Sequence, residues 1–162
     1  MSRRVTRRDG AASRGQALVE FAIVAPVFFL LLFGLIDLGR YVYVTNSFAQ
    51  AAREGARYGS VPYWYQSCPA SVTTKTRFDC VQQETKNRLA GAPVYYTVTV
   101  SCTTSDTLTT RTSDACRADD VLKITIATPT TPASQRFTFF TPFVGQLIGS
   151  PVVSATTQAI VQ

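Results

Sequence analysis

The sequence contains no histidine, and its acidic residues are few: ten Asp and Glu against sixteen Lys and Arg in 162 residues. Without histidine the chain has no Ser-His-Asp triad, Cys-His pair or histidine metal ligand of its own. It also has no GxGxxG or GxxxxGK(S/T) motif, so nothing supports nucleotide binding. We therefore predict that the protein is not an enzyme and has no catalytic residue, metal site or cofactor.

Positive charge is concentrated at the N-terminus. Residues 1–15 carry five arginines and Asp9, a net charge of +4, whereas the whole chain has a formal charge of +6. Arg-rich tails can bind nucleic acid, but no aromatic residue interleaves these arginines and an apolar segment follows them directly. We therefore expect a disordered basic leader over residues 1–15 and no nucleic-acid partner.

One long apolar segment follows the leader. Sixteen uncharged residues occupy positions 21–36, and twelve of them are Leu, Ile, Val or Phe. A helix that begins at Leu18 and ends at Leu38 would be about 31 Å long, which matches the roughly 30 Å hydrocarbon core of a bilayer. We predict a single-pass transmembrane helix in contact with membrane lipid. The positive-inside rule places its N-terminus in the cytoplasm and the rest of the chain outside.

Two other targeting signals compete with this prediction. A cleavable secretory signal would use residues 49–51 as its Ala-x-Ala site, but Asp37 and Arg40 separate that site from the apolar run. Twin arginines are present near the N-terminus, but the Asp-Gly pair at residues 9–10 stands where a twin-arginine signal turns apolar. We expect neither signal.

All four cysteines follow the apolar segment. They are Cys68, Cys80, Cys102 and Cys116. The predicted orientation places them in an oxidising compartment, where disulfides persist. Three pairings are possible, and we favour Cys68–Cys80 with Cys102–Cys116 because each closes a short polar loop. Zinc is disfavoured, since there is no closely spaced Cys pair and no histidine.

A glycine and a glutamate stand at fixed positions before the apolar run. Gly15 follows the arginines, four residues intervene, and Glu20-Phe21 come next. A carboxylate beside a membrane segment is costly and usually has a function or a partner. The alternative is an interfacial Glu whose carboxylate reaches the lipid headgroups. This order resembles the prepilin leader of type IV pilins, with an aromatic after the Glu as in the Flp (tight adherence, Tad) branch. Residues 21–40 and 49–58 resemble the TadE-like family of minor pilins.

The resemblance implies a role and a set of partners. A prepilin peptidase would cut between Gly15 and Gln16, and Glu20 and Phe21 would act in peptidase recognition and assembly. The protein would be a pseudopilin (minor pilin) that contributes to biogenesis of a Flp/Tad-type pilus, together with other pilins and the Tad secretion machinery. The expected location is the bacterial cytoplasmic (inner) membrane, or the pilus itself.

The remainder of the chain predicts an α+β fold, organised as a long helix over residues 16–59 and an extracytoplasmic domain over residues 60–162. Small residues and one Phe form a narrow helix face that we expect to pack in the protein's own core: Phe48, Ala52, Gly55, Ala56 and Gly59. A capping box at Asp79 and Gln82 should open a short second helix.

The expected strands form a small antiparallel sheet of three or four strands. Residues 94–102, 121–128 and 151–161 alternate in polarity, as strands do. Residues 103–120 are expected to be a polar loop, and residues 137–139 a strand edge.

A second interpretation comes from a different functional class. The aromatic run Tyr63-Trp64-Tyr65 would suit a signal-anchored, extracytoplasmic binding module, for example one for carbohydrate. Packing over the edge of the sheet is the alternative role for these side chains.

Overall fold

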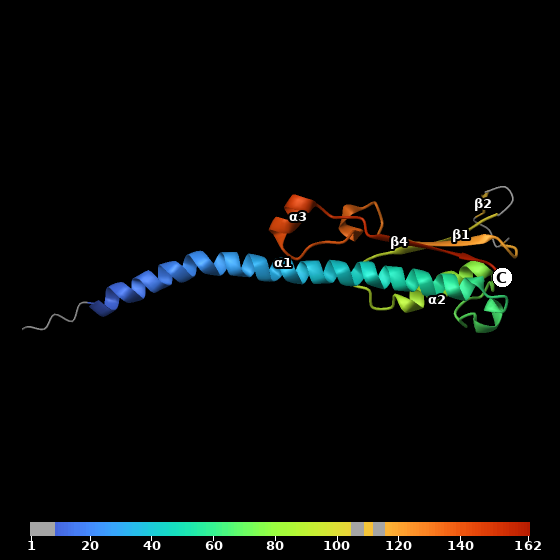
Figure 1. Ribbon diagram of the computed structural model, residues 1–162, viewed down its shortest axis with the longest axis horizontal. Helices are drawn as coiled ribbons and strands as arrows, with labels where there is room; N and C mark the ends of the chain where they lie inside the picture. The colour runs from blue at the N-terminus through green and yellow to red at the C-terminus, as the bar shows by residue number, and fades with distance from the viewer. Residues whose placement is uncertain (1–8, 105–108, 112–115) are drawn as a thin grey trace, which may run out of the picture.

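A single long helix, α1 (Asp9–Ser60), runs the length of the molecule in the computed structural model, which describes residues 9–104, 109–111 and 116–162 (Figure 1). The remaining elements gather along its C-terminal part. The helix already begins at Asp9, so the prediction of a disordered leader is wrong for residues 9–15, and residues 1–8 lie outside the described residues. Adding turns to an existing helix needs no new nucleus, and Ala11 and Ala12 are good helix formers.

The second half of α1 presents the predicted narrow face to the core. Val44, Phe48, Ala52 and Ala56 are all buried there, and Phe48 packs edge-on against Tyr96 of the domain. The prediction that this face packs in the protein's own core is confirmed.

Four strands form one antiparallel sheet in the order β2-β1-β3-β4. The bounds are Thr97–Thr103 for β1, Thr110–Arg111 for β2, Val121–Ala127 for β3 and Ser154–Ile160 for β4. Strands β3 and β4 lie along α1 (Figure 1). The alternating residues Leu122, Ile124 and Ile126 of β3 are fully buried, as the period of two predicted. The α+β prediction is confirmed.

The second helix, α2 (Arg77–Arg88), begins earlier than predicted. Its N-cap is Thr76, whose Oγ1 accepts a hydrogen bond from Asp79 N–H at 3.2 Å, while the Asp79 carboxylate accepts from Thr76 Oγ1 at 2.7 Å. Asp79 is therefore the third residue of the helix and not its cap. The prediction shifted the motif by three residues because Asp can occupy either position.

Three other sequence-based boundaries differ from the structure. Strand β1 begins at Thr97 and not at residue 94, and the predicted loop over 103–120 contains the short β2. Residues 137–139 are not a strand. Phe137 is fully buried and packs against Tyr41. The apolar residues that suggested a strand therefore belong to a buried loop.

Two disulfides join the cysteines, Cys68–Cys80 and Cys102–Cys116. The first ties the loop after α1 to α2, and the second ties β1 to the segment that leads into β3. Each closes a short loop, of 12 and 14 residues in sequence separation, and a loop of this size is worth about 3 kcal/mol in the chain-entropy model. This is the local pairing that the sequence analysis favoured.

Two glycines allow α1 to approach its neighbours closely. A Cβ on Gly55 would overlap Thr85 Oγ1, and one on Gly59 would overlap side chains of Leu122 and Val81. Thr85 cannot easily move, because its hydroxyl donates to Val81 O at 2.7 Å in the core. The small residues of this face are therefore required by contact with α2 and the sheet.

Gly55→Leu is expected to destabilise the folded domain, by about 1–3 kcal/mol for the overpacked contact. Gly39→Leu is the matched control, since a Cβ on Gly39 meets nothing within 4 Å and the substitution gains up to roughly 1 kcal/mol of helix propensity. Urea unfolding of the full chain in mild detergent measures both. Equal midpoints for the two variants would contradict the close approach.

Candidate membrane and assembly segment

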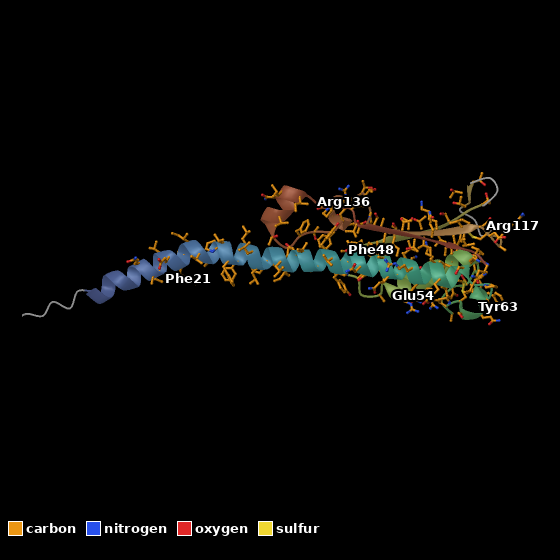
Figure 2. The ribbon with its side chains drawn as sticks, in the orientation of Figure 1. Phe21, Phe48, Glu54, Tyr63, Arg117 and Arg136 are labelled. Atoms are coloured by element: carbon orange, nitrogen blue, oxygen red, sulfur yellow. A yellow bond between two sulfur atoms is a disulfide. The ribbon has the colours of Figure 1, made fainter. Side chains whose placement is uncertain are left out.

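From Phe21 to Leu32, α1 is apolar on every side and almost entirely exposed. Among the described residues, this is the one helix long and apolar enough to cross a membrane, and none of its most apolar window is buried. In Figure 2 the part of α1 around Phe21 extends away from the folded domain. A helix that is apolar all round belongs in a protein core or a bilayer. No core surrounds this part of α1, so the helix is a single-pass membrane anchor.

The N-terminal half of α1 is gently bent (Figure 1), and Pro26 lies inside this helix. Proline has no N–H to donate to the preceding turn and its ring crowds the carbonyl there. Such a bend is tolerated in a membrane helix, where neighbouring groups satisfy the freed carbonyl. The helix stays continuous through this point, so the anchor and the domain are mechanically connected.

The residues of the predicted cleavage and assembly site lie at the exposed end of α1. Gln16, Glu20 and Phe21 are exposed, and a Cβ on Gly15 would meet nothing within 4 Å. Gln16 and Glu20 are four residues apart, so they share one helix face. Glu20 forms no ion pair with any side chain that the structure describes.

Asp37 is the residue whose role sequence reasoning missed. It is only 1% exposed. Its Oδ1 accepts the Phe140 N–H at 2.8 Å, and its Oδ2 accepts the Thr141 N–H at 2.9 Å and the Thr141 hydroxyl at 2.7 Å. Asp37 also forms an ion pair with Arg40, three residues on, at 3.5 Å. The presence of a carboxylate inside a predicted span was the signal that a partner was needed.

These hydrogen bonds hold a C-terminal segment against α1. Thr141 is the N-cap of the short helix α3 (Pro142–Ile148), so Asp37 binds the chain just where α3 begins. Phe137 packs on Tyr41 with ring centroids 5.5 Å apart. The segment therefore contacts α1 through both polar and aromatic groups.

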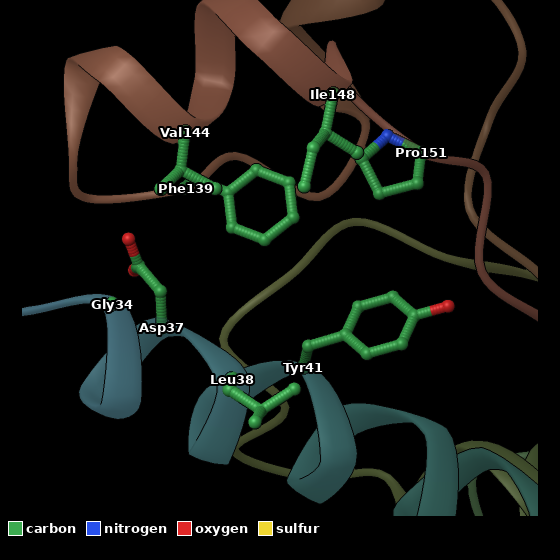
Figure 3. Close-up of a pocket in the computed structure, with 8 residues that line it drawn as sticks. All are labelled: Gly34, Asp37, Leu38, Tyr41, Phe139, Val144, Ile148 and Pro151. Atoms are coloured by element: carbon green, nitrogen blue, oxygen red, sulfur yellow. The ribbon is translucent and has the colours of Figure 1, made fainter. Parts of the chain in front are cut away.

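An apolar pocket of about 360 Å³ lies between α1 and α3. Leu38 and Tyr41 line it from α1, and Asp37 points across toward the α3 side (Figure 3). The facing wall consists of Phe139, Val144, Ile148 and Pro151. Apart from Asp37, whose oxygens are already hydrogen-bonded, the pocket walls present few groups that could take part in a reaction.

The aromatic run lies at the opposite end of α1 from the anchor, in the 3-10 turn η1 (Trp64–Ser67) and just before it (Figure 2). Arg77 stacks over the Trp64 ring at 5.6 Å, and the Tyr58 hydroxyl donates to Trp64 O at 2.7 Å. Burial, with the Glu84 charge adding to it, raises the pKa of Tyr58. Tyr63 and Tyr65 remain exposed. The turn contacts α1 and α2.

No cluster of His, Cys, Asp or Glu within the described ranges is placed to hold a metal ion. Of the acidic residues in the described part of α1, Asp37 is buried and hydrogen-bonded, Glu54 pairs with Arg57, and Glu20 is exposed.

A family model described as TadE-like protein matches residues 15–57. The match confirms the resemblance over that stretch, which includes Gly15, Glu20, the exposed anchor, Asp37 and most of the small-residue face. The strands and α2 lie beyond it. No curated protein and no solved structure shows a significant match to the chain.

Proposed function

Because residues 15–57 match the TadE-like family, we propose that this protein is a pseudopilin (minor pilin) that contributes to biogenesis of a Flp/Tad-type pilus. Residues 18–38 hold it in the bacterial cytoplasmic membrane, with the N-terminus in the cytoplasm and residues 60–162 outside. The observation that carries the proposal is one continuous helix whose first half is uncovered and whose second half forms the domain core.

This division of α1 suits subunit assembly. The core residues begin near Val44, so the domain folds without using the first half of the helix. That half exposes a large apolar surface, which in water marks an interaction site. Lipid covers it in the membrane, and helices of other subunits would cover it in a pilus or an assembly complex.

Cleavage by a prepilin peptidase would complete the assembly site. A cut between Gly15 and Gln16 removes the basic leader and leaves a free amine on Gln16. That amine stands four residues from Glu20 on the same helix face. Since α1 is helical through the cut, its N-terminal turns must open for the peptidase, which the fraying of helix ends allows.

Gly15→Val is expected to block processing almost completely, because the peptidase needs a small residue at the cut. The parent protein from its native cell should begin at Gln16, as read by N-terminal sequencing. Gly10→Val, in the same leader, is the matched control and should be processed normally. A native protein that still begins near Met1, or that begins at Ala52, would refute the proposed cleavage.

A second function is supported by the exposed aromatic side chains. Tyr63 is 64% exposed and Tyr65 is 50% exposed, and exposed aromatic rings can stack on sugars. The alternative is a signal-anchored carbohydrate-binding module. Genes for a prepilin peptidase, a secretion ATPase and a platform protein beside this gene favour the pseudopilin, and their absence favours the binding module.

A further inference from the structure

Three large apolar side chains on the α3 segment (residues 137–148) are exposed, although one of them, Ile148, also lines the pocket that faces α1. Phe140 is 72% exposed, Leu147 is 76% exposed and Ile148 is 62% exposed, and we name them the membrane-proximal patch. The chain carries no Asp, Glu, Lys or Arg from residue 137 to its last residue. An exposed, uncharged group of this kind marks a surface that another apolar phase covers.

The patch is continuous with the membrane anchor. The Phe140 ring lies 6.1 Å from the Phe33 ring of α1, and Phe33 in turn stacks on Phe29 at 6.1 Å. Asp37 fixes this arrangement, since its carboxylate binds the backbone N–H groups of Phe140 and Thr141. A series of contacting aromatic rings therefore connects the anchor to the α3 segment.

The depth of the patch follows from the length of the anchor. Phe33 lies five residues before Leu38, the outer end of the proposed span, which corresponds to about 8 Å of helix. Interfacial segments bury their apolar faces roughly 5–10 Å into the boundary between headgroups and acyl chains. Phe140, beside Phe33, falls within this depth.

We propose that the α3 segment is a second, non-spanning membrane contact that inserts Phe140, Leu147 and Ile148 into the leaflet facing the domain. The occupant is lipid, because at this level along α1 every neighbour of an unassembled subunit is lipid. The segment also covers Asp37 and so allows a carboxylate to lie at membrane depth with its oxygens hydrogen-bonded. This inference rests on the span in the proposed function.

Depth-dependent fluorescence quenching tests the proposal on the full chain in nanodiscs of phosphatidylcholine and phosphatidylglycerol. Trp64 is the single tryptophan, so a Trp64→Phe background accepts one probe at a time. The patch probes are Leu147→Trp and Phe140→Trp, both at exposed positions where folding tolerates a change. Leu30→Trp in the anchor is the positive control, and Tyr95→Trp, exposed on the domain, is the negative control.

Both patch probes are expected to lose most of their emission when the lipids are brominated near the headgroups, and to resist aqueous iodide. Leu30→Trp should respond more to bromine near the acyl-chain ends, and Tyr95→Trp only to iodide. If Leu30→Trp is quenched by bromine while the patch probes respond to iodide alone, the inference is overturned and the span stands. Patch probes shielded from both quenchers would mean a protein contact and also overturn it. If Leu30→Trp is not quenched by bromine, the span fails and both proposals fall.

Discussion

Replacing Glu20 by Gln is expected to leave the protein inserted in the membrane with a folded outer domain, yet unable to co-purify with other pilus components. The substitution keeps the size of the side chain and removes its charge. Glu20 is exposed and forms no ion pair with a described side chain, and the core begins near Val44, roughly 36 Å further along the helix. The domain therefore has no reason to change.

The expected loss comes from the partner charge. After cleavage, the Gln16 amine of one subunit would meet Glu20 of another in an apolar environment. Two buried opposite charges are tolerable when paired, and removing one leaves the other stranded at a cost of about 3–5 kcal/mol. A loss of that size lowers an association constant by more than a hundredfold.

Glu54→Gln is the control for this experiment. Glu54 lies on the same helix, is partly exposed, and pairs with Arg57 at 3.0 Å, a surface ion pair of little energetic value. Co-purification of the Glu54→Gln protein should match the parent. If Glu20→Gln also assembles like the parent, or if its domain becomes sensitive to protease, the assigned role is wrong.

Asp37→Asn is expected to release the α3 segment from α1. The carboxylate accepts four hydrogen bonds, from Phe140 N–H, Thr141 N–H, the Thr141 hydroxyl and, at 3.5 Å, Arg40. An amide of the same shape presents an NH₂ group to at least one of these donors, and a buried unsatisfied group costs about 1–3 kcal/mol in addition to the lost charged hydrogen bond. The total is about 3 kcal/mol.

Hydrogen exchange measures this release directly. The amides of Phe140 and Thr141 should exchange on the order of 100-fold faster in Asp37→Asn, because about 3 kcal/mol of local stability is removed. Amides of β3 should keep their protection, since the sheet core does not depend on Asp37. Glu54→Gln again serves as the carboxylate-to-amide control. Unchanged exchange at Phe140 and Thr141 would show that the hydrogen bonds do not hold the segment.

Local patterns in the sequence were enough to determine the long helix and the inward faces of the sheet. The uncharged run over 21–36 and the recurrence of Phe48, Ala52 and Ala56 on one helix face specify α1 from about residue 16 to its C-terminal end. Alternation specifies Leu122 and Ile124 in the same way. In each case the buried positions recur with the period of the helix or strand that contains them. Neighbouring residues are therefore enough to predict which side chains face the core.

Local sequence was less decisive where one residue type suits two neighbouring positions. Asp79 can be the cap of a helix or its third residue, and the choice depends on whether Thr76 is free to cap. The leader likewise contains both disorder-promoting arginines and helix-forming alanines. Residues 9–15 of the leader are helical because they continue an existing helix, and that continuity is a property of the folded chain.

Only the tertiary structure decided which distant groups meet. The partners of Asp37 lie 103 and 104 residues along the chain, and Phe137 is buried by Tyr41 although it belongs to no strand. Gly55 is needed because Thr85 of α2 approaches the helix backbone there. The hydrogen-bond partners of a buried polar group, the residues that bury a loop side chain and the neighbour at a close contact all depend on which segments the fold brings together. These segments are distant in the sequence, so no local periodicity predicts which of them meet.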